Sequence, residues 1–487
     1  MSVFSSKMMD LRPVCWWRLG EASGTVVVDS GSSSSSGTYV NSPLLGQPGA
    51  VASDPNTAVR FDASGGRRAD IPDHNVESLT RANDSFVRIN PFFFPPATQG
   101  WTDNWGTADH GGAWTAEVTT GSGWYRTNVY AQINQTRTAA TWQQGIAIAQ
   151  QNADIQVRAS WSVVAAGGAL SPVALVARRT DNNNYYRASL RENVDHSMDL
   201  LLVKVVAGVS TTVQIVSIPG TYAANDWWFI RFQLEDTHLR AKAWKLSALG
   251  VADQPAWQID TSDSSITTSI GNISIRSSNS GSTARPIVSF SDFRIQTVGL
   301  TIHFFMRMNK TSFNTPAGGG QYVVLLSKED NGQAEWHFRL YSANASNTHA
   351  GWLSFYTFNL EGGLGNGAAY WQPGDGATPL PAMDSNTWYQ FVGVMDPGDF
   401  RDWQAGVRLY KDGALVPIPP MSAGEKYENH DSSGNTWHID PKNGSAPVRM
   451  GSVTASTDFQ CTLDEVAIFA RRLTADEIKS LWDARFQ

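Results

Sequence analysis

Apolar and polar residues alternate in short segments along most of the chain, and Gly, Asn, Asp and Pro separate these segments. Residues 154–159, 228–234 and 239–244 alternate with a period of two, which is typical of strands with one buried face. Asp412-Gly413 separates two further alternating runs and predicts a hairpin, because both residues tolerate positive φ. The pattern predicts an all-β protein built from antiparallel strands.

A convincing helical pattern occurs at the C-terminus. Thr474 can cap the first turn, and Glu477, three residues later, completes a capping box. Ile478 and Leu481 then share one apolar face. We expect this short helix to cover the β structure, and we expect residues 1–9 to form an N-terminal arm.

Composition and charge exclude several classes of protein. Charged residues make up 17% of the 487 residues, and the formal net charge is −7. Runs of Lys and Arg never exceed two residues, so a nucleic acid is not an expected partner. No segment approaches the ~18 consecutive apolar residues of a membrane span, and the N-terminus lacks the apolar region of a signal peptide. We therefore expect neither a membrane span nor an encoded export signal.

Motifs near both ends of the chain follow one family pattern. It opens with Trp17-Arg18-Leu19-Gly20-Glu21-Ala22-Ser23-Gly24, resumes far downstream at residues 299–307 and 388–394, and closes with residues 463–469 and the C-terminal helix. This order resembles a laminin-G-like domain, the concanavalin A-like jelly roll in its bacterial and phage form. In that family the strand matching residues 299–307 follows the opening directly. The resemblance therefore implies that the domain is interrupted.

The interrupting segment has a resemblance of its own. Trp105-Gly106-Thr107-Ala108, residues 239–244 and Phe290-Ser291-Asp292-Phe293-Arg294 occur in the order seen in a second kind of jelly roll. That domain is found in actinobacterial extracellular proteins and actinobacteriophage tail proteins. The resemblances imply two antiparallel β-sandwich jelly rolls, one inserted in the other. The discontinuous one comprises residues 10–82 and 299–487, and the inserted one comprises residues 83–298. The alternative is a linear string of three domains, which limited proteolysis near residues 83 and 298 would distinguish.

The chain has two cysteines, too few for a disulfide scaffold or a cysteine-rich zinc site. The nested arrangement implies that Cys15 and Cys461 lie near each other, in the first and last strands of the discontinuous domain. We expect two buried reduced thiols, with a disulfide between the chain ends as the alternative.

Catalytic motifs are missing from the sequence. Glycoside hydrolysis needs two carboxylates across one cleft, and the Glu-x-Asp-x-x-Glu string that places them on one strand face does not occur. Asp464 and Glu465 are adjacent and should point to opposite faces of a strand. No Gly-x-Ser-x-Gly elbow is present. We therefore expect no enzymatic activity.

Calcium is the one cofactor that the resemblance suggests. Jelly rolls of both kinds often bind calcium through an aspartate and backbone carbonyls. Asp292, which matches the Phe-Asp-Asp-Phe-Arg motif of the second family, is the first candidate ligand, and Asp464 is the second. Alternatively, both carboxylates accept hydrogen bonds from turn amides.

The 19 tryptophans fall into groups. Five coincide with core positions of the two families: Trp17, Trp114, Trp244, Trp257 and Trp388. Seven lie in segments rich in Gly, Asn and Asp: Trp101, Trp105, Trp124, Trp352, Trp371, Trp403 and Trp437. Exposed aromatic rings suit both sugar faces and protein interfaces. The candidates for glycan or interface contact are Trp124, Tyr125, Tyr370, Trp371, Trp403 and Trp437. Phe92, Phe93 and Phe94, between prolines, are a packed loop or a contact for a partner subunit.

The resemblances and the missing catalytic motifs predict a non-enzymatic virion protein of a bacteriophage, a minor tail or tail-tip component. Its expected partners are other virion proteins, in an oligomer within the particle, and glycans of the host cell envelope. It would be assembled in the host cytoplasm. The alternative is a bacterial carbohydrate-binding protein, or a glycoside hydrolase-like protein of the concanavalin A-like class.

Overall fold

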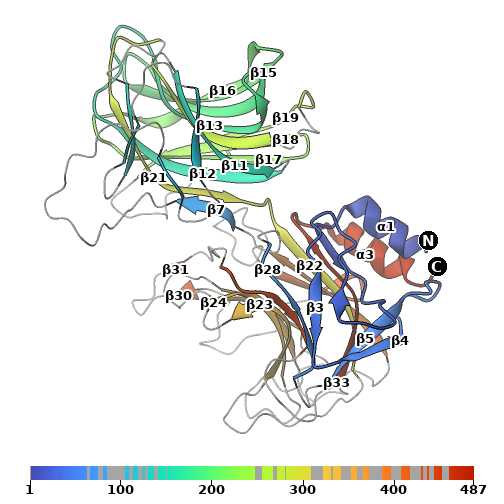
Figure 1. The fold of residues 1–487 in the computed structure, drawn as a ribbon. Coiled ribbons are helices and arrows are strands. Elements are labelled where there is room, and N and C mark those ends of the chain that lie inside the picture. Colours follow the sequence, from blue (N-terminus) through green and yellow to red (C-terminus); the bar gives the residue numbers. More distant parts are fainter. Residues whose placement is uncertain are drawn as a thin grey trace, which may run out of the picture. The chain divides into compact units, whose positions relative to one another are not determined.

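The computed structural model is built almost entirely from β-strands, with one short helix near each end of the chain (Figure 1). Every strand pairing among the described residues is antiparallel. The structure describes residues 2–62, 66–74, 80–84, 105–108, 113–118, 124–126, 130–135, 141–150, 152–246, 255–266, 271–279, 281–308, 322–330, 333–341, 352–358, 366–371, 387–395, 407–416, 429–430, 436–437, 444–451 and 460–487. The predicted all-β fold class is confirmed.

The chain divides into two compact units. Unit 1 comprises Met1–Leu79 together with Gly299–Gln487, and unit 2 comprises Thr80–Val298. Segments from both ends of the chain therefore lie in the same unit. Whether each unit folds independently, as nested domains would, stays a prediction.

Unit 1 contains two sheets. Its back sheet, defined as the one that holds the first and last strands, has the order β29 (Ala414–Leu415), β28 (Val407–Lys411), β27 (Trp388–Met395), β22 (Leu300–Met308), β33 (Gln460–Phe469), β5 (Thr57–Asp62), β4 (Leu44–Pro48), with β1 (Cys15–Trp17) also pairing with β33. Its front sheet has the order β2 (Val26–Val27), β3 (Gly37–Val40), β6 (Arg68–Ile71), β32 (Val448–Met450), β23 (Tyr322–Asp330), β24 (Gln333–Tyr341), β25 (Leu353–Phe358), β26 (Asn366–Trp371). The apolar faces of both sheets contribute to one buried core.

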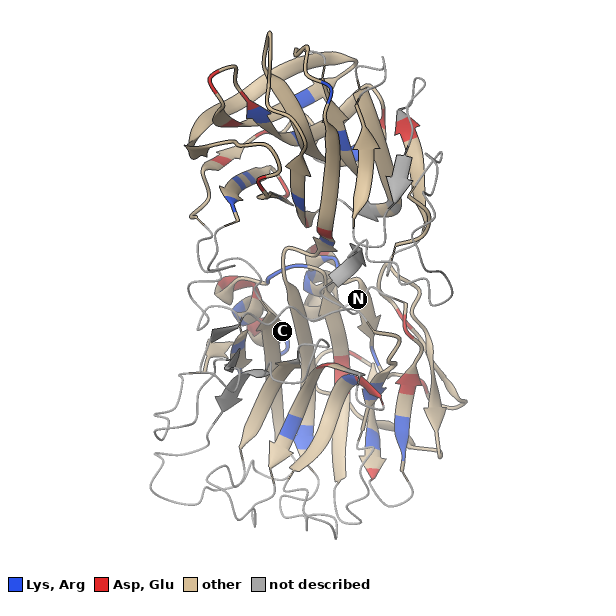
Figure 2. Cartoon of the chain, turned by 90° about the vertical axis from the view of Figure 1, so that its left-hand side faces the viewer, with Lys and Arg blue, Asp and Glu red and all other residues tan. Residues whose placement is uncertain are grey.

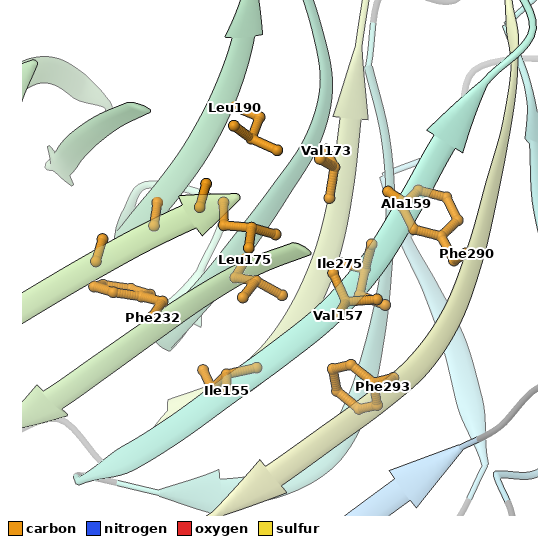
Figure 3. Packing of buried hydrophobic residues seen from close by; sticks show 14 of the residues in the cluster. Ile155, Val157, Ala159, Val173, Leu175, Leu190, Phe232, Ile275, Phe290 and Phe293 are labelled. Atoms are coloured by element: carbon orange, nitrogen blue, oxygen red, sulfur yellow. The ribbon is translucent and has the colours of Figure 1, made fainter. Parts of the chain in front are cut away.

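Unit 2 also contains two sheets. The back sheet has the order β19 (Ile259–Ser262), β18 (His238–Lys245), β17 (Trp228–Glu235), β12 (Ala153–Trp161), β21 (Ile287–Gln296), β10 (Ala131–Asn134), β9 (Trp124–Arg126), with β7 (Thr80–Asp84) also on β21. The front sheet has the order β16 (Val209–Thr221), β15 (Ser197–Val206), β14 (Asn184–Glu192), β13 (Leu170–Asp181), β20 (Gly271–Ser278), β11 (Thr141–Gln150), β8 (Trp114–Val118). Figure 3 shows the core, where Val157 and Phe290 of the back sheet pack with Leu175 and Ile275 of the front sheet.

The two units share one strand order. β22 and β33 are central in the back sheet of unit 1, as β12 and β21 are in unit 2. In the front sheets, β26-β25-β24-β23-β32 corresponds to β16-β15-β14-β13-β20. The chain therefore contains two jelly rolls of the same topology, and a position in one unit has a counterpart in the other. A small separate sheet pairs β30 (Asn429–His430) with β31 (Thr436–Trp437).

The C-terminal helix α3 (Ala475–Ala484) begins as predicted, with the complete capping box of Thr474 and Glu477. The expected N-terminal arm is instead a helix, α1 (Val3–Leu11), capped by Ser2. Phe4 and Met8, four residues apart, are buried on the outer face of the back sheet. The two helices lie side by side there (Figure 1). No helix among the described residues is long and apolar enough to span a membrane.

The cysteines are two buried free thiols. Cys15 pairs with Ile468 on β33, seven residues along that strand from Cys461. At ~3.3 Å per residue, this separation is far beyond the ~7 Å reach of a disulfide. The expectation that the two cysteines lie near each other was therefore wrong, although both belong to the same sheet.

Most of the tryptophans assigned to the cores are buried, but two assignments were wrong. Trp257 is half-buried and lies against cations of the back sheet of unit 2, with Lys242 Nζ 4.6 Å from its ring centroid. Trp105, expected in a loop, is 1% exposed and packs edge-on against Trp114, with ring centroids 5.2 Å apart. Its indole Nε1 donates to the Gln132 carbonyl, which explains how a loop indole is accommodated in a core.

Candidate functional site

The predicted aromatic site residues do not form one cluster in the described structure. Trp124 and Tyr125 lie in β9, an edge strand of unit 2, whereas Tyr370 and Trp371 lie in β26, an edge strand of unit 1. Trp437 lies in the small strand β31. Trp403 and the Phe92, Phe93, Phe94 segment lie outside the described residues.

Strand register distinguishes the two members of each aromatic pair. Trp371 is opposite Leu353, a core residue, whereas Tyr370 is opposite Ser354 on the outer face of the front sheet. The same contrast holds in unit 2, where Trp124 is opposite the core residue Ile133. Register therefore places Tyr370, and not Trp371, in a row of outer-face positions.

That outer face of the front sheet of unit 1 carries a cation between aromatic rings. The guanidinium carbon of Arg339 lies 4.3 Å from the Tyr322 ring centroid and 4.2 Å from the Tyr356 ring centroid. The hydroxyls of Tyr341 and Tyr356 are 3.2 Å apart. Burial raises the pKa of Tyr341, so its hydroxyl stays protonated. We call these four residues, together with His337 and Ser354, the front-face cluster.

His337 adds a neutral imidazole to the front-face cluster. Burial lowers the pKa of His337 to about 4, so the ring is uncharged at neutral pH. Its Nδ1 lies 2.7 Å from Oε2 of Glu329 and can donate a hydrogen bond to that carboxylate. This hydrogen bond is the main reason that the pKa of Glu329 is lowered. Glu329 is thus held ionised, which is unsuitable for a general acid.

Ser354 is a buried polar group with an unused hydroxyl. Its side chain is 0% exposed, and its Oγ makes no hydrogen bond. Ser354 is opposite Arg339 on one side and opposite Tyr370 on the other. Because Ser354 is fully buried, its hydroxyl is out of a ligand's reach, and the cluster reaches the surface through the half-buried Tyr322 and Arg339. Aromatic faces, a guanidinium and hydroxyls together are the groups that bind the ring face and the hydroxyls of a sugar.

The residues predicted from the sequence did not include this cluster, although the sequence of β24 carries a signal for it. In β24, His337, Arg339 and Tyr341 alternate with the core residues Trp336, Phe338 and Leu340. The outer positions of an exposed strand are usually small or charged, so aromatic and polar residues at alternate positions indicated a specialised face.

The adjacent acids Asp464 and Glu465 do not point to opposite faces, contrary to expectation. Glu465 has φ of 50° and forms a β-bulge, in which Glu465 and Val466 together face Phe304 of β22. Both carboxylates therefore reach Nδ2 of Asn56, at 3.4 Å from Asp464 and 3.3 Å from Glu465. Both side chains are buried, and burial raises the pKa of Glu465 to about 7.

These buried acids are satisfied by the protein itself. Asp464 accepts from the backbone amide of Ala50 at 2.6 Å, which is the alternative to calcium binding considered from sequence. Glu465 accepts from the indole of Trp16 at 2.6 Å and from Arg18 Nη2 at 3.0 Å. The pair therefore ties β33 to the N-terminal segment.

Asp292 occupies the corresponding bulge in unit 2. It has φ of 52°, and Asp292 and Phe293 together face Val157 of β12. Its Oδ2 lies 2.9 Å from Arg158 Nε, so this half-exposed carboxylate has a cation as its partner. The described residues contain no cluster of three His, Cys, Asp or Glu that could hold a metal ion. Calcium binding through backbone carbonyls at Asp292 or Asp464 stays a prediction.

The described fold can be compared with known proteins. Residues 281–479 match the family model of the concanavalin A-like lectin/glucanases superfamily. This segment is therefore similar to a concanavalin A-like domain. No curated protein matches the chain.

Three solved structures with similar folds each cover less than half of the chain. The carbohydrate-binding module CBM66 from Bacillus subtilis is 16% identical, covers 38% of this chain and 95% of its own, and has a TM-score of 0.28. The Bacillus licheniformis β-glucanase is 12% identical, covers 44% of this chain and 96% of its own, and has a TM-score of 0.30. A β-1,3-glucanase from Mycobacterium marinum is 11% identical, with 44% and 98% covered and a TM-score of 0.28.

Proposed function

We propose that this protein binds glycans without cleaving them, through the front-face cluster of unit 1. The observation that carries the proposal is the half-buried Arg339 guanidinium held between the rings of Tyr322 and Tyr356. The rings provide apolar faces for a sugar ring, and the polar groups provide hydrogen bonds for its hydroxyls. Tyr370, a glycan candidate from the sequence, occupies the adjacent register position.

The state of the described carboxylates supports binding without hydrolysis. A glycosidase needs an accessible acid of raised pKa opposite a second carboxylate. Glu329, beside the cluster, has a lowered pKa because of its hydrogen bond with His337. Asp464 and Glu465, whose pKa values are raised by burial, are 1% and 0% exposed on the other sheet. Among the described residues, the acids of raised pKa are therefore out of a substrate's reach.

Replacing Tyr322, the half-buried ring of the cluster, by alanine should weaken glycan binding about tenfold or more, because aromatic contacts carry much of a binding energy. The measurement is a glycan array with purified protein, followed by calorimetry on the best ligand, with and without calcium and chelator. Trp257→Ala is the matched control, since Trp257 also contacts cations but lies on a back sheet. A blank array for the wild-type protein would contradict the proposal, as would release of reducing sugar.

We further propose that the protein acts in a bacteriophage virion, as a minor tail or tail-tip component that contacts host cell-envelope glycans. The support is the sequence resemblance to actinobacteriophage tail domains and the missing catalytic strings. Mass spectrometry of purified particles should detect the chain in a fixed ratio to other tail proteins. Its presence in cell-free medium but not in particles would favour the alternative, a bacterial carbohydrate-binding protein.

A further inference from the structure

The front sheet of unit 2 carries two arginines on its outer face that have no counter-ion among the described residues. Arg187 lies on β14 and Arg276 on β20, and the strand between them, β13, is opposite both. Val176 on β13 is opposite Arg187, and Ala174 is opposite Arg276. Both arginines are half-buried. Figure 2 shows that Lys and Arg of this part of the chain lie on the strands themselves as well as on loops.

Neither guanidinium is paired with a carboxylate. Arg276 donates from Nη1 to the Gln143 amide oxygen at 3.2 Å and to the Tyr185 hydroxyl at 3.1 Å, both of which are neutral groups. Its Nε makes no hydrogen bond, and neither does Nε of Arg187. Among the described residues, the side chain of Arg187 has no hydrogen bond, ion pair or ring contact.

Glu117, an acid near this face, is already neutralised. Glu117 lies over Gly145, where a Cβ would clash with its carboxylate. That carboxylate accepts from Arg179 at 3.0 Å, from Gln143 at 2.7 Å and from the Ser274 hydroxyl at 2.5 Å. Glu117 and Arg179 therefore cancel, and the charges of Arg187 and Arg276 remain.

This arrangement is unfavourable in the unliganded protein. Burial lowers the pKa of Arg276, and the nearby Arg187 and Arg179 lower it further. Half-buried charges are ordinarily paired, because removing them from water costs free energy that a partner must offset. The outer face is otherwise neutral around them, with Val176, Tyr185 and Val205 packed together.

We propose that this face binds an acidic sugar, whose carboxylate is held by the half-buried guanidinium groups of Arg187 and Arg276. Guanidinium groups match planar carboxylates with paired hydrogen bonds. In a uronic acid the charge is attached directly to the ring, so the sugar ring is held close to the two arginines. The inference uses the proposed function in one respect, that the ligand is a sugar, and it concerns a separate site in the other unit.

The binding test compares tri-galacturonate with its methyl ester, which has the same sugar rings without charge. Calorimetry should show binding of the acid form, and Arg187→Met with Arg276→Met should weaken it about 30-fold or more. Trp257→Ala, which lies outside both proposed sites and contacts Lys242, should leave this binding unchanged. Equal binding of acid and ester, or unchanged binding by the double variant, would overturn the proposal. So would equal affinity for inorganic phosphate, which lacks a sugar ring.

The stability of the double variant gives an independent test. If Arg187 and Arg276 stabilised the fold, replacing them would lower the melting temperature of unit 2. If their charges are uncompensated, replacing them should leave the melting temperature unchanged or raise it. A melting temperature lowered as much as that of the Arg179→Met variant would overturn the proposal. If a neutral-glycan array is blank and tri-galacturonate still binds through Arg187 and Arg276, the proposed function of unit 1 fails and this inference stands.

Discussion

Replacing Asp154 by alanine should lower the free energy of unfolding of unit 2 by about 3–5 kcal/mol, the usual cost of leaving a buried charge without its partner. Asp154 Oδ1 accepts from Arg231 Nε at 2.7 Å, and Oδ2 accepts from Arg231 Nη2 at 2.5 Å. Gln233 donates to the same carboxylate at 2.8 Å. Because Arg231 is 0% exposed, its guanidinium would have no water to replace the lost carboxylate.

The pH dependence of this pair has a defined sign. Burial is the largest single influence and would raise the pKa of Asp154, but Arg231, Gln233 and Arg294 together outweigh burial and hold the pKa below its usual value. The stabilisation is therefore present above the unfolded-state pKa, near 3.9, and is lost only as pH falls through the lower folded-state value. The free energies of unfolding of the wild type and of Asp154→Ala should show their full difference at pH 7, and this difference should disappear in strong acid.

Urea denaturation of wild type and variant measures this effect. Asp292→Ala is the matched control on the same sheet, since its ion pair with Arg158 is half-exposed, and should cost under about 1 kcal/mol. The double variant Asp154→Leu with Arg231→Met should recover most of the loss, because it leaves no unpaired charge. Similar losses for Asp154→Ala and Asp292→Ala would show that the buried pair has no special role.

The alternating patterns predicted the strands well, because burial of one strand face imposes a period of two on the sequence. β12 and β17 follow that period, and α3 follows from its capping box. The helix α1 was missed, although Phe4 and Met8 are spaced to share a helix face. The segment is short and largely polar, so its sequence did not predict a helix. The stability of this helix comes from packing on the sheet.

The chemical groupings were much harder to predict. A bulge at Glu465 turns two adjacent acids to the same side, and φ of 50° at an acidic residue has no local sequence signal. Arg187 and Arg276 look like ordinary solvent-facing positions of two strands. Within the part of the chain that the structure describes, no carboxylate pairs with them, because of the register across β14, β13 and β20 and because Glu117 is already paired with Arg179. Such information depends on three-dimensional neighbours.

Replacing Arg18 is the second substitution for which we expect a large loss of stability, because Arg18 contacts residues that are distant in the sequence. Its Nη2 lies 2.8 Å from Asp54 Oδ2 and 3.0 Å from Glu465 Oε1, beside the buried Asp464. Ser2 and Ser5 of the α1 N-terminus also donate to Asp54. Arg18 is therefore the cation that joins the N-terminal helix region to β33.

Replacing Arg18 by methionine should lower the free energy of unfolding of unit 1 by about 2–3 kcal/mol at pH 8, somewhat less than for a fully buried pair because the side chain is 28% exposed. Burial raises the pKa of Glu465 to about 7, and Arg18 opposes that rise. Since the folded-state pKa is above the unfolded-state value, the native state binds the extra proton, and stability falls as pH rises from about 4.5 towards 7. Without Arg18, ionisation of the buried Glu465 lowers the stability of unit 1 by a larger amount.

The difference between wild type and Arg18→Met should therefore shrink as pH is lowered from 8 to 5, where Glu465 becomes protonated. A remainder should persist at pH 5, because the pKa of Asp54 is about 2 and that carboxylate stays charged. His303, which contacts the Glu465 carbonyl, has its pKa lowered by burial to about 4 and stays neutral over this range. Arg68→Met, which removes a surface pair with Asp70, is the control and should cost under about 1 kcal/mol at both pH values. An Arg18→Met loss that is the same at pH 8 and pH 5 would mean that Glu465 does not titrate in this window, and that Arg18 acts through packing alone.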